Sequence, residues 1–171
     1  MRQILKQLDE NCERWLLLVF YTMIVVTIAN EVVRRFVLSY SSVWGEEVAR
    51  YAFIYLVWIG VSAAVRDRAH IRIDVLLHYL SPRGKAFIYL IGDFVMLAVA
   101  LLALYFSFET LMTSIKFGSV THGLRIEQAW FIAAVPFGFT LTCFRLMQSI
   151  WRDWGDLRGG RSVFEGHKLF D

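Results

Sequence analysis

Asp93 and Arg145 are the ionisable residues that most need a chemical explanation. Asp93 is the only acid inside an otherwise apolar stretch, and an isolated aspartate at the centre of a membrane costs about 2.5–3.5 kcal/mol on insertion scales. Counted by helical rise, both residues fall at a similar depth near the same end of their predicted helices. We therefore predict an Asp93–Arg145 pair that ties two helices together, with a proton or ion relay as the alternative chemistry.

The four histidines bear on a second function, the haem-bearing membrane anchor of a redox enzyme. Such an anchor needs axial histidines that face each other from membrane-spanning helices. His70 and His78 fall in one predicted loop, His122 in another and His167 in the C-terminal tail. None of them lies inside an apolar run, which disfavours haem ligation. The redox anchor is kept as the alternative function.

Other catalytic patterns are missing from the sequence. It has no phosphate-binding glycine loop, no zinc-ligand spacing and no nucleophile–base pattern. Cys12 and Cys143 form no CxxC motif, which favours apolar packing over redox chemistry. A small proton-coupled exporter would need an acid facing its substrate cavity, and the first apolar run, residues 15–30, offers none. We expect no enzyme activity, no cofactor, no metal and no nucleic-acid partner.

A charged segment surrounds the second apolar run. Tyr51 to Val65 is free of charge but only 15 residues long, roughly 22 Å of helix, so a membrane span must include the turns beside it. Those turns carry Glu46, Glu47 and Arg50. Charged side chains at membrane depth are stable at the interface, or against protein or water. Two interpretations stay open: an interfacial collar with Glu46 and Arg50 paired at i,i+4, or a face that docks on another membrane protein.

The composition around these residues is that of a membrane protein. Of 171 residues, 57% are hydrophobic and 16% aromatic, and the length allows one domain. We predict an all-α integral membrane fold with four transmembrane helices in one domain, residues 1–155. The predicted spans cover residues 15–38, 43–65, 82–117 and 127–151. Ser41 or Ser42 is expected to cap the second span, Pro82 to begin the third and Pro136 to kink the fourth.

The two ends of the chain flank these spans. Residues 1–14 have apolar residues at helical spacing, which predicts a short amphipathic helix on the membrane surface. Residues 156–171 form a polar tail that contains glycine. Thirteen Lys and Arg residues fall at the two termini and in the second connection, against five in the first and third connections. The positive-inside rule therefore places both termini in the cytoplasm.

The second connection is the most basic one in the chain. Between Arg66 and Lys85, charged residues alternate with apolar ones, and His70 and Asp74 stand at the i,i+4 spacing of an ordered local contact. One interpretation is a topogenic loop that touches anionic lipid headgroups. The other is an anchor for the cytoplasmic elements of a partner protein.

The order and spacing of these residues resemble a known family. The chain is similar, over nearly its whole length, to the DctQ-like small membrane subunits of tripartite ATP-independent periplasmic (TRAP) transporters. The strongest part of the resemblance comprises Arg35, Phe36, Trp44, Glu46, Glu47, Arg50, Tyr51, Trp58, Gly60, Ala63, Arg66, His70 and Asp74. A weaker part runs from Trp130 to Pro136 and includes Gly138. Val61 and Ser62 depart from the family pattern, which more often has an alanine directly after the glycine.

The resemblance implies a complex of three proteins at a bacterial inner membrane. A large elevator-type permease subunit carries the substrate and sodium sites, and a soluble periplasmic protein captures the substrate, typically an organic acid such as a C4-dicarboxylate or sialic acid. The small subunit braces the large one and does no catalysis. We expect contacts with the large permease, the periplasmic protein or membrane lipids from ten residues: Arg35, Trp44, Glu46, Glu47, Arg50, Tyr51, Trp58, Arg66, His70 and Asp74.

Overall fold

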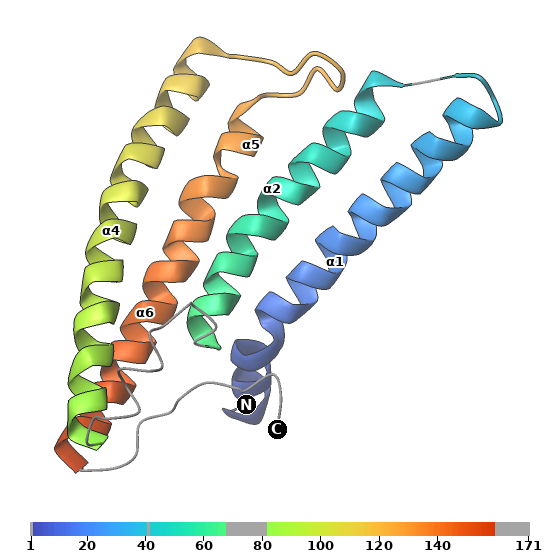
Figure 1. Cartoon of the computed structure of the whole chain (residues 1–171). Helices are drawn as coiled ribbons and strands as arrows, with labels where there is room; N and C mark the ends of the chain where they lie inside the picture. The colour runs from blue at the N-terminus through green and yellow to red at the C-terminus, as the bar shows by residue number, and fades with distance from the viewer. Residues whose placement is uncertain (1, 41, 68–81, 160–171) are drawn as a thin grey trace.

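The fold is built of helices joined by loops in the part of the chain that the computed structural model describes, residues 2–40, 42–67 and 82–159, with an isolated β-bridge between Val120 and Glu127 in one loop (Figure 1). The helices are α1 (Arg2–Phe36), α2 (Val43–Arg66), α4 (Pro82–Phe117), α5 (Ala129–Ile132) and α6 (Ala134–Gly159). Four of the segments in this part are long and apolar enough to cross a membrane, with α5 and α6 together forming the fourth. The predicted all-α architecture with four membrane-length helices is confirmed.

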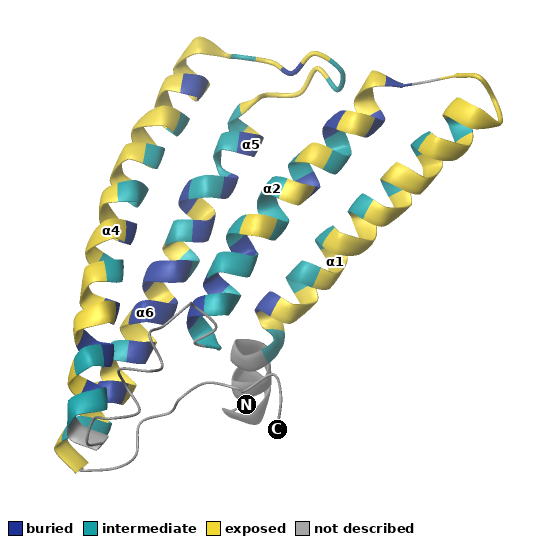
Figure 2. Cartoon of the chain, viewed as in Figure 1, coloured by how far each residue is buried: buried dark blue, intermediate teal, exposed yellow. Residues whose placement is uncertain are grey.

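The long helices stand in a row. α1 packs on α2, α2 packs on α6, and α6 packs on α4, so that α2 and α6 are central and α1 and α4 are outer (Figure 1). Successive helices run in opposite directions, so the start of α1 and the end of α6 lie at one end, which we name the terminal end. The other, named the loop end, carries the α1–α2 and α4–α5 connections. Figure 2 shows that α1 and α4 expose most of their surface, as expected for the outer members of a row.

The contact between the two central helices depends on small side chains. A Cβ atom added at Gly138 on α6 would lie 2.5 Å from the Cβ of Trp58 on α2, so only glycine allows this approach. Farther toward the terminal end, Val65 of α2 and Leu146 of α6 belong to one buried apolar cluster, which α4 joins through Ala100. Close backbone approach at small residues is the usual way in which helices pack inside a membrane.

The ends of the helices follow local chemistry. α4 starts at Pro82, whose missing N–H and fixed φ suit the first helical position, and it stops where Gly118 takes a left-handed φ of 57°. Ser42 is at the N-cap position of α2, as predicted, but its hydroxyl does not cap the helix. It donates instead to the carboxylate of Glu31 on α1, a charged acceptor that forms a stronger hydrogen bond than a neutral one.

The fourth span is interrupted near Pro136, where the sequence predicts a kink. The interruption is at Ala133, between α5 and α6. Proline has no N–H for the carbonyl oxygen four residues earlier, here that of Ile132, and its ring crowds that carbonyl. The neighbouring carbonyl of Trp130 accepts a hydrogen bond from the Tyr55 hydroxyl of α2 at 2.6 Å. A side chain of the adjacent helix thus compensates the irregular backbone.

The two ends of the chain differ in detail from the predicted boundaries. α1 is one continuous helix from Arg2, so the predicted surface helix over residues 1–14 is not a separate element; the side chains of residues 1–10 lie outside the described residues. α6 continues to Gly159, which makes the first four residues of the predicted tail helical. Residues 160–171 and the basic connection at 68–81 lie outside the described residues.

Candidate functional site

A buried acid at the terminal end joins three helices. The Glu13 carboxylate of α1 is only 2% exposed. Its Oε1 accepts hydrogen bonds from Arg145 Nε of α6 at 2.7 Å and from Ser62 Oγ of α2 at 2.8 Å. Its Oε2 lies 3.2 Å from Arg66 Nη1 of α2. We name these four residues the Glu13 cluster; it balances charges that would be costly to bury alone.

Asp93 and Arg145, the predicted intramembrane pair, are both buried at this same end. Asp93 on α4 accepts a hydrogen bond from Ser149 Oγ at 2.7 Å, and Ser149 lies one turn beyond Arg145 on α6. Arg145 contacts Glu13 and also donates to Gln148 Oε1 at 2.7 Å. Asp93 therefore ties α4 to α6 as expected of a structural acid, while its direct pairing with Arg145 stays a prediction.

A second acid organises the loop end. Glu47 of α2 is buried, and its carboxylate accepts the backbone N–H groups of Gly123 and Leu124, each at 2.8 Å. A Cβ atom at Gly123 would lie 3.0 Å from the carboxylate and 3.2 Å from the backbone nitrogen of Trp44, so this loop approaches α2 very closely. We name this contact the loop clamp. It fixes the α4–α5 connection over the start of α2.

A third acid, Glu31, joins α1 to the start of α2. Its carboxylate accepts the backbone N–H of Ser42 at 3.3 Å in addition to the Ser42 hydroxyl, and Arg34 lies 3.7 Å away. The Glu31 side chain lies directly over Gly45, where any larger residue would collide with it. Glycine at this position thus lets the carboxylate reach the N-terminal turn of α2.

Glu46 and Arg50 point outward beside the loop clamp. The predicted i,i+4 pair is formed, with Arg50 Nη2 2.8 Å from Glu46 Oε1, and the two side chains are 62% and 77% exposed respectively. Trp44 is also exposed, at 42%, with the Arg34 guanidinium 5.4 Å from its ring centroid. Of the acids at the start of α2, Glu47 therefore serves the fold, and Glu46 is available to a neighbour.

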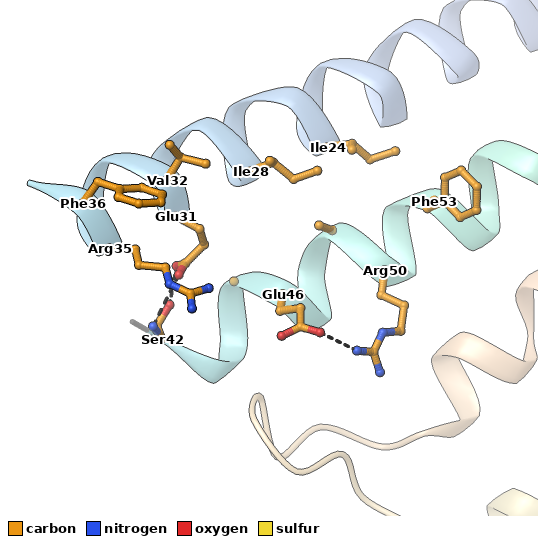
Figure 3. A pocket seen from close by; sticks show the side chains of 12 residues that line it. Ile24, Ile28, Glu31, Val32, Arg35, Phe36, Ser42, Glu46, Arg50 and Phe53 are labelled. Carbon is orange, nitrogen blue, oxygen red and sulfur yellow. Dashed lines mark hydrogen bonds and ion pairs between the residues drawn. The ribbon is translucent and has the colours of Figure 1, made fainter. Parts of the chain in front are cut away.

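An open groove runs between α1 and α2 at the loop end (Figure 3). Its volume is about 530 Å³, and it has both charged and apolar walls. The lining residues are Ile24, Ile28, Glu31, Val32, Arg35, Phe36, Ser42, Gly45, Glu46, Ala49, Arg50 and Phe53. Arg35 is thus placed at a concave surface.

The remaining interface candidates lie at different places. The ring of Tyr51 stacks on Phe131 of α5, and that of Trp58 packs on Phe139 of α6 at 4.7 Å between centroids, so both hold helices of this chain together. Arg66 contacts Glu13 and Asp67. His70 and Asp74 lie outside the described residues.

Glu13 and Glu31 are the important residues that sequence reasoning missed. Glu13 falls within the predicted surface helix, where an acid needs no explanation. A depth argument could have found it, because Glu13 directly precedes the first predicted span, Arg66 follows the second and Arg145 lies near the end of the fourth. In helices of alternating direction, these three positions meet at one end.

The chain matches one family of known proteins. The sequence model described as "Tripartite ATP-independent periplasmic transporters, DctQ component" matches residues 23–156, most of the chain. The chain belongs to this family. The resemblance proposed from the charged segment around α2 is therefore confirmed, and the comparisons give no support to a redox-enzyme anchor.

Individual relatives agree with this assignment. The C4-dicarboxylate TRAP transporter small permease protein DctQ of Vibrio cholerae is 28% identical, with 85% of this chain and 72% of the relative covered. The sialic acid TRAP transporter small permease protein SiaQ of the same species is 20% identical, with 87% and 85% covered. The isethionate TRAP transporter permease protein DctMQ of Oleidesulfovibrio alaskensis is 26% identical over 86% of this chain, which spans only 24% of that longer protein. This chain is thus a TRAP transporter small permease subunit.

Proposed function

We propose that this subunit is a non-catalytic scaffold that braces a large TRAP permease in the bacterial inner membrane. In this proposal both termini are cytoplasmic, and a periplasmic binding protein delivers an organic acid that enters with sodium. The observation that carries the proposal is the single row of helices, with outer helices that leave long apolar surfaces uncovered. Surfaces of this kind inside a membrane suit contact with lipid and with the helices of a partner.

The contacts of the buried acids favour a scaffold role for this subunit and disfavour a transport pathway through it. Glu13, Asp93 and Glu47 each accept hydrogen bonds from a different element of the chain. An acid in a proton or ion pathway must exchange its partners during transport, whereas these three connect helices and a loop. Their contacts therefore support rigidity, which a brace for a moving permease requires.

The exposed residues at the start of α2 are the proposed contact with the permease or the periplasmic protein. Trp44, Glu46 and Arg50 combine an aromatic ring with two opposite charges, and none of the three is buried within this chain. Aromatic residues and arginines are enriched in protein interfaces. They lie at the loop end, which is the periplasmic end in the proposed orientation.

The relatives support the choice of partner and cargo. The isethionate relative is a permease about four times the length matched by this chain, which favours a larger membrane protein as neighbour. The names of two relatives refer to isethionate and C4-dicarboxylates, which favours an organic acid as the substrate of the complex. In this proposal the substrate and sodium sites belong to the large permease.

Co-purification with a co-expressed large TRAP permease tests the proposal. A tagged copy of the subunit should retain the permease in mild detergent, and a triple variant, Trp44→Ala with Glu46→Ala and Arg50→Ala, should lose most of it. Lys116→Ala is the matched control, because it removes an exposed charge of α4 that is also at the loop end. This variant should behave like the natural chain. A chain that never retains the permease, or a triple variant that retains it fully, would contradict the proposed contact.

A further inference from the structure

The groove between α1 and α2 is polar at the loop end and apolar along the α1 wall beyond it, while the Glu46–Arg50 pair lies along the α2 wall. Arg35 and Ser42 are at the loop end, and Ile24 of α1 and Phe53 of α2 are at the deep end (Figure 3). Both walls belong to helices of membrane-spanning length. The deep part of the groove therefore opens toward hydrocarbon and the polar part toward the headgroup region.

The length of the groove matches one leaflet of a bilayer. Arg35 follows Ile24 by 11 positions along α1, and Phe53 of α2 follows the N-cap residue Ser42 by 11 positions. At the rise of an α-helix, each wall is about 16 Å long. Half of a hydrocarbon core of roughly 30 Å is about 15 Å. A molecule with a polar head and an apolar chain one leaflet deep fits these dimensions.

Arg35 supplies the unbalanced charge at the polar end. The Glu31 carboxylate beside it is held by Ser42 and Arg34, and Glu46 is paired with Arg50. Within the described part of the chain, Arg35 itself forms no salt bridge. Figure 3 shows its side chain reaching from α1 toward the first turn of α2. A guanidinium in this position is suited to a phosphate group.

We propose that this groove binds one glycerophospholipid, with the phosphodiester against Arg35 and an acyl chain along Ile28, Ile24 and Phe53. The volume of about 530 Å³ holds part of the lipid, and the remainder stays in the bilayer. Charge complementarity favours a phospholipid over an uncharged amphiphile. The polar end also favours it over an apolar partner helix, which would leave the Arg35 guanidinium without an acceptor.

Native mass spectrometry of the delipidated full-length chain tests this site. The probes are phosphatidylglycerol, phosphatidylethanolamine and diacylglycerol, which share acyl chains and differ in the headgroup. Both phospholipids should give a singly bound species. Diacylglycerol, which has no phosphate, should bind about tenfold more weakly, because one charge-assisted hydrogen bond contributes about one decade of affinity. Equal binding of diacylglycerol and the two phospholipids would overturn phosphate recognition in the groove.

Two variants locate the lipid in the groove. Arg35→Gln should reduce phospholipid binding about tenfold, whereas Lys116→Gln, a loss of exposed charge at the same end, should leave it unchanged. Ala49→Trp fills the middle of the groove and should lower the binding of every probe. If Arg35→Gln and the natural chain bind phospholipid equally, the bound lipid is only nonspecific lipid around the protein, and the proposal is overturned. Loss of the permease from Arg35→Gln with lipid binding unchanged would assign the groove to a protein and overturn it as well.

Discussion

Replacing Glu13 by alanine should be far more damaging than its place near the N-terminus suggests. The substitution removes the carboxylate that contacts Arg145 Nε at 2.7 Å and Arg66 Nη1 at 3.2 Å. Arg145 is only 7% exposed. Breaking a buried ion pair by removing one partner costs about 3–5 kcal/mol, because the remaining charge stays buried without that carboxylate. Glu13→Ala should lower the free energy of unfolding by about this amount.

Reversible unfolding in mixed micelles, followed by tryptophan fluorescence, measures this effect. The matched control is Glu46→Ala, which breaks an ion pair whose two members are mostly exposed and should cost at most about 1 kcal/mol. In a double-mutant cycle, Glu13→Ala and Arg145→Ala should be strongly non-additive because the residues are in contact. A Glu13→Ala variant as stable as Glu46→Ala would refute the assignment of the Glu13 cluster as the tie between α1, α2 and α6.

Two further substitutions test the packing and the loop. Gly138→Ala should destabilise the fold by about 1–3 kcal/mol, because the new methyl group collides with Trp58; Gly92→Ala, where nothing lies within 4 Å, should cost nothing in the same unfolding assay. Glu47→Ala should free the α4–α5 loop, since two backbone N–H groups lose a charged acceptor. The rate of tryptic cleavage within that loop, followed by the masses of the fragments, should rise at least about tenfold. Glu46→Ala is the control for this cleavage, and an unchanged rate in Glu47→Ala would rule out the loop clamp.

The sequence predicts how deep a residue lies in the membrane better than it predicts which neighbour its side chain faces. The charge-free runs and Pro82 indicate four spans, and the described residues form four helical segments of membrane-spanning length, with α4 starting at that proline. The sequence does not show how α2 and α4 are rotated about their axes, that is, which face of each helix packs against its neighbours. Their lipid-facing and protein-facing sides are both apolar, so no polar stripe marks the outside. The order of the helices in a row depends on those hidden faces.

Because the sequence does not show which helix faces meet, it predicts only some of the contacts that the charged residues make. Depth alone groups Asp93 with Arg145, but Ser149 and Glu13 at that depth offer contacts that only the packed helices reveal. The local Glu46–Arg50 pair was predictable because i,i+4 neighbours on a helix face each other without tertiary structure. The role of Glu47 was not predictable, since its partners follow 76 and 77 residues later in the chain.

Solute uptake into vesicles tests the central claim most directly, namely that this subunit supports transport without carrying the cargo. Vesicles containing this chain alone, with a sodium gradient and a radiolabelled C4-dicarboxylate, isethionate or sialic acid outside, should accumulate nothing above protein-free vesicles. Adding a large TRAP permease and a periplasmic binding protein that form a complex with this chain should produce sodium-dependent uptake of one of these acids, and omitting this chain should abolish it. Sodium-driven uptake by this chain alone would contradict the account.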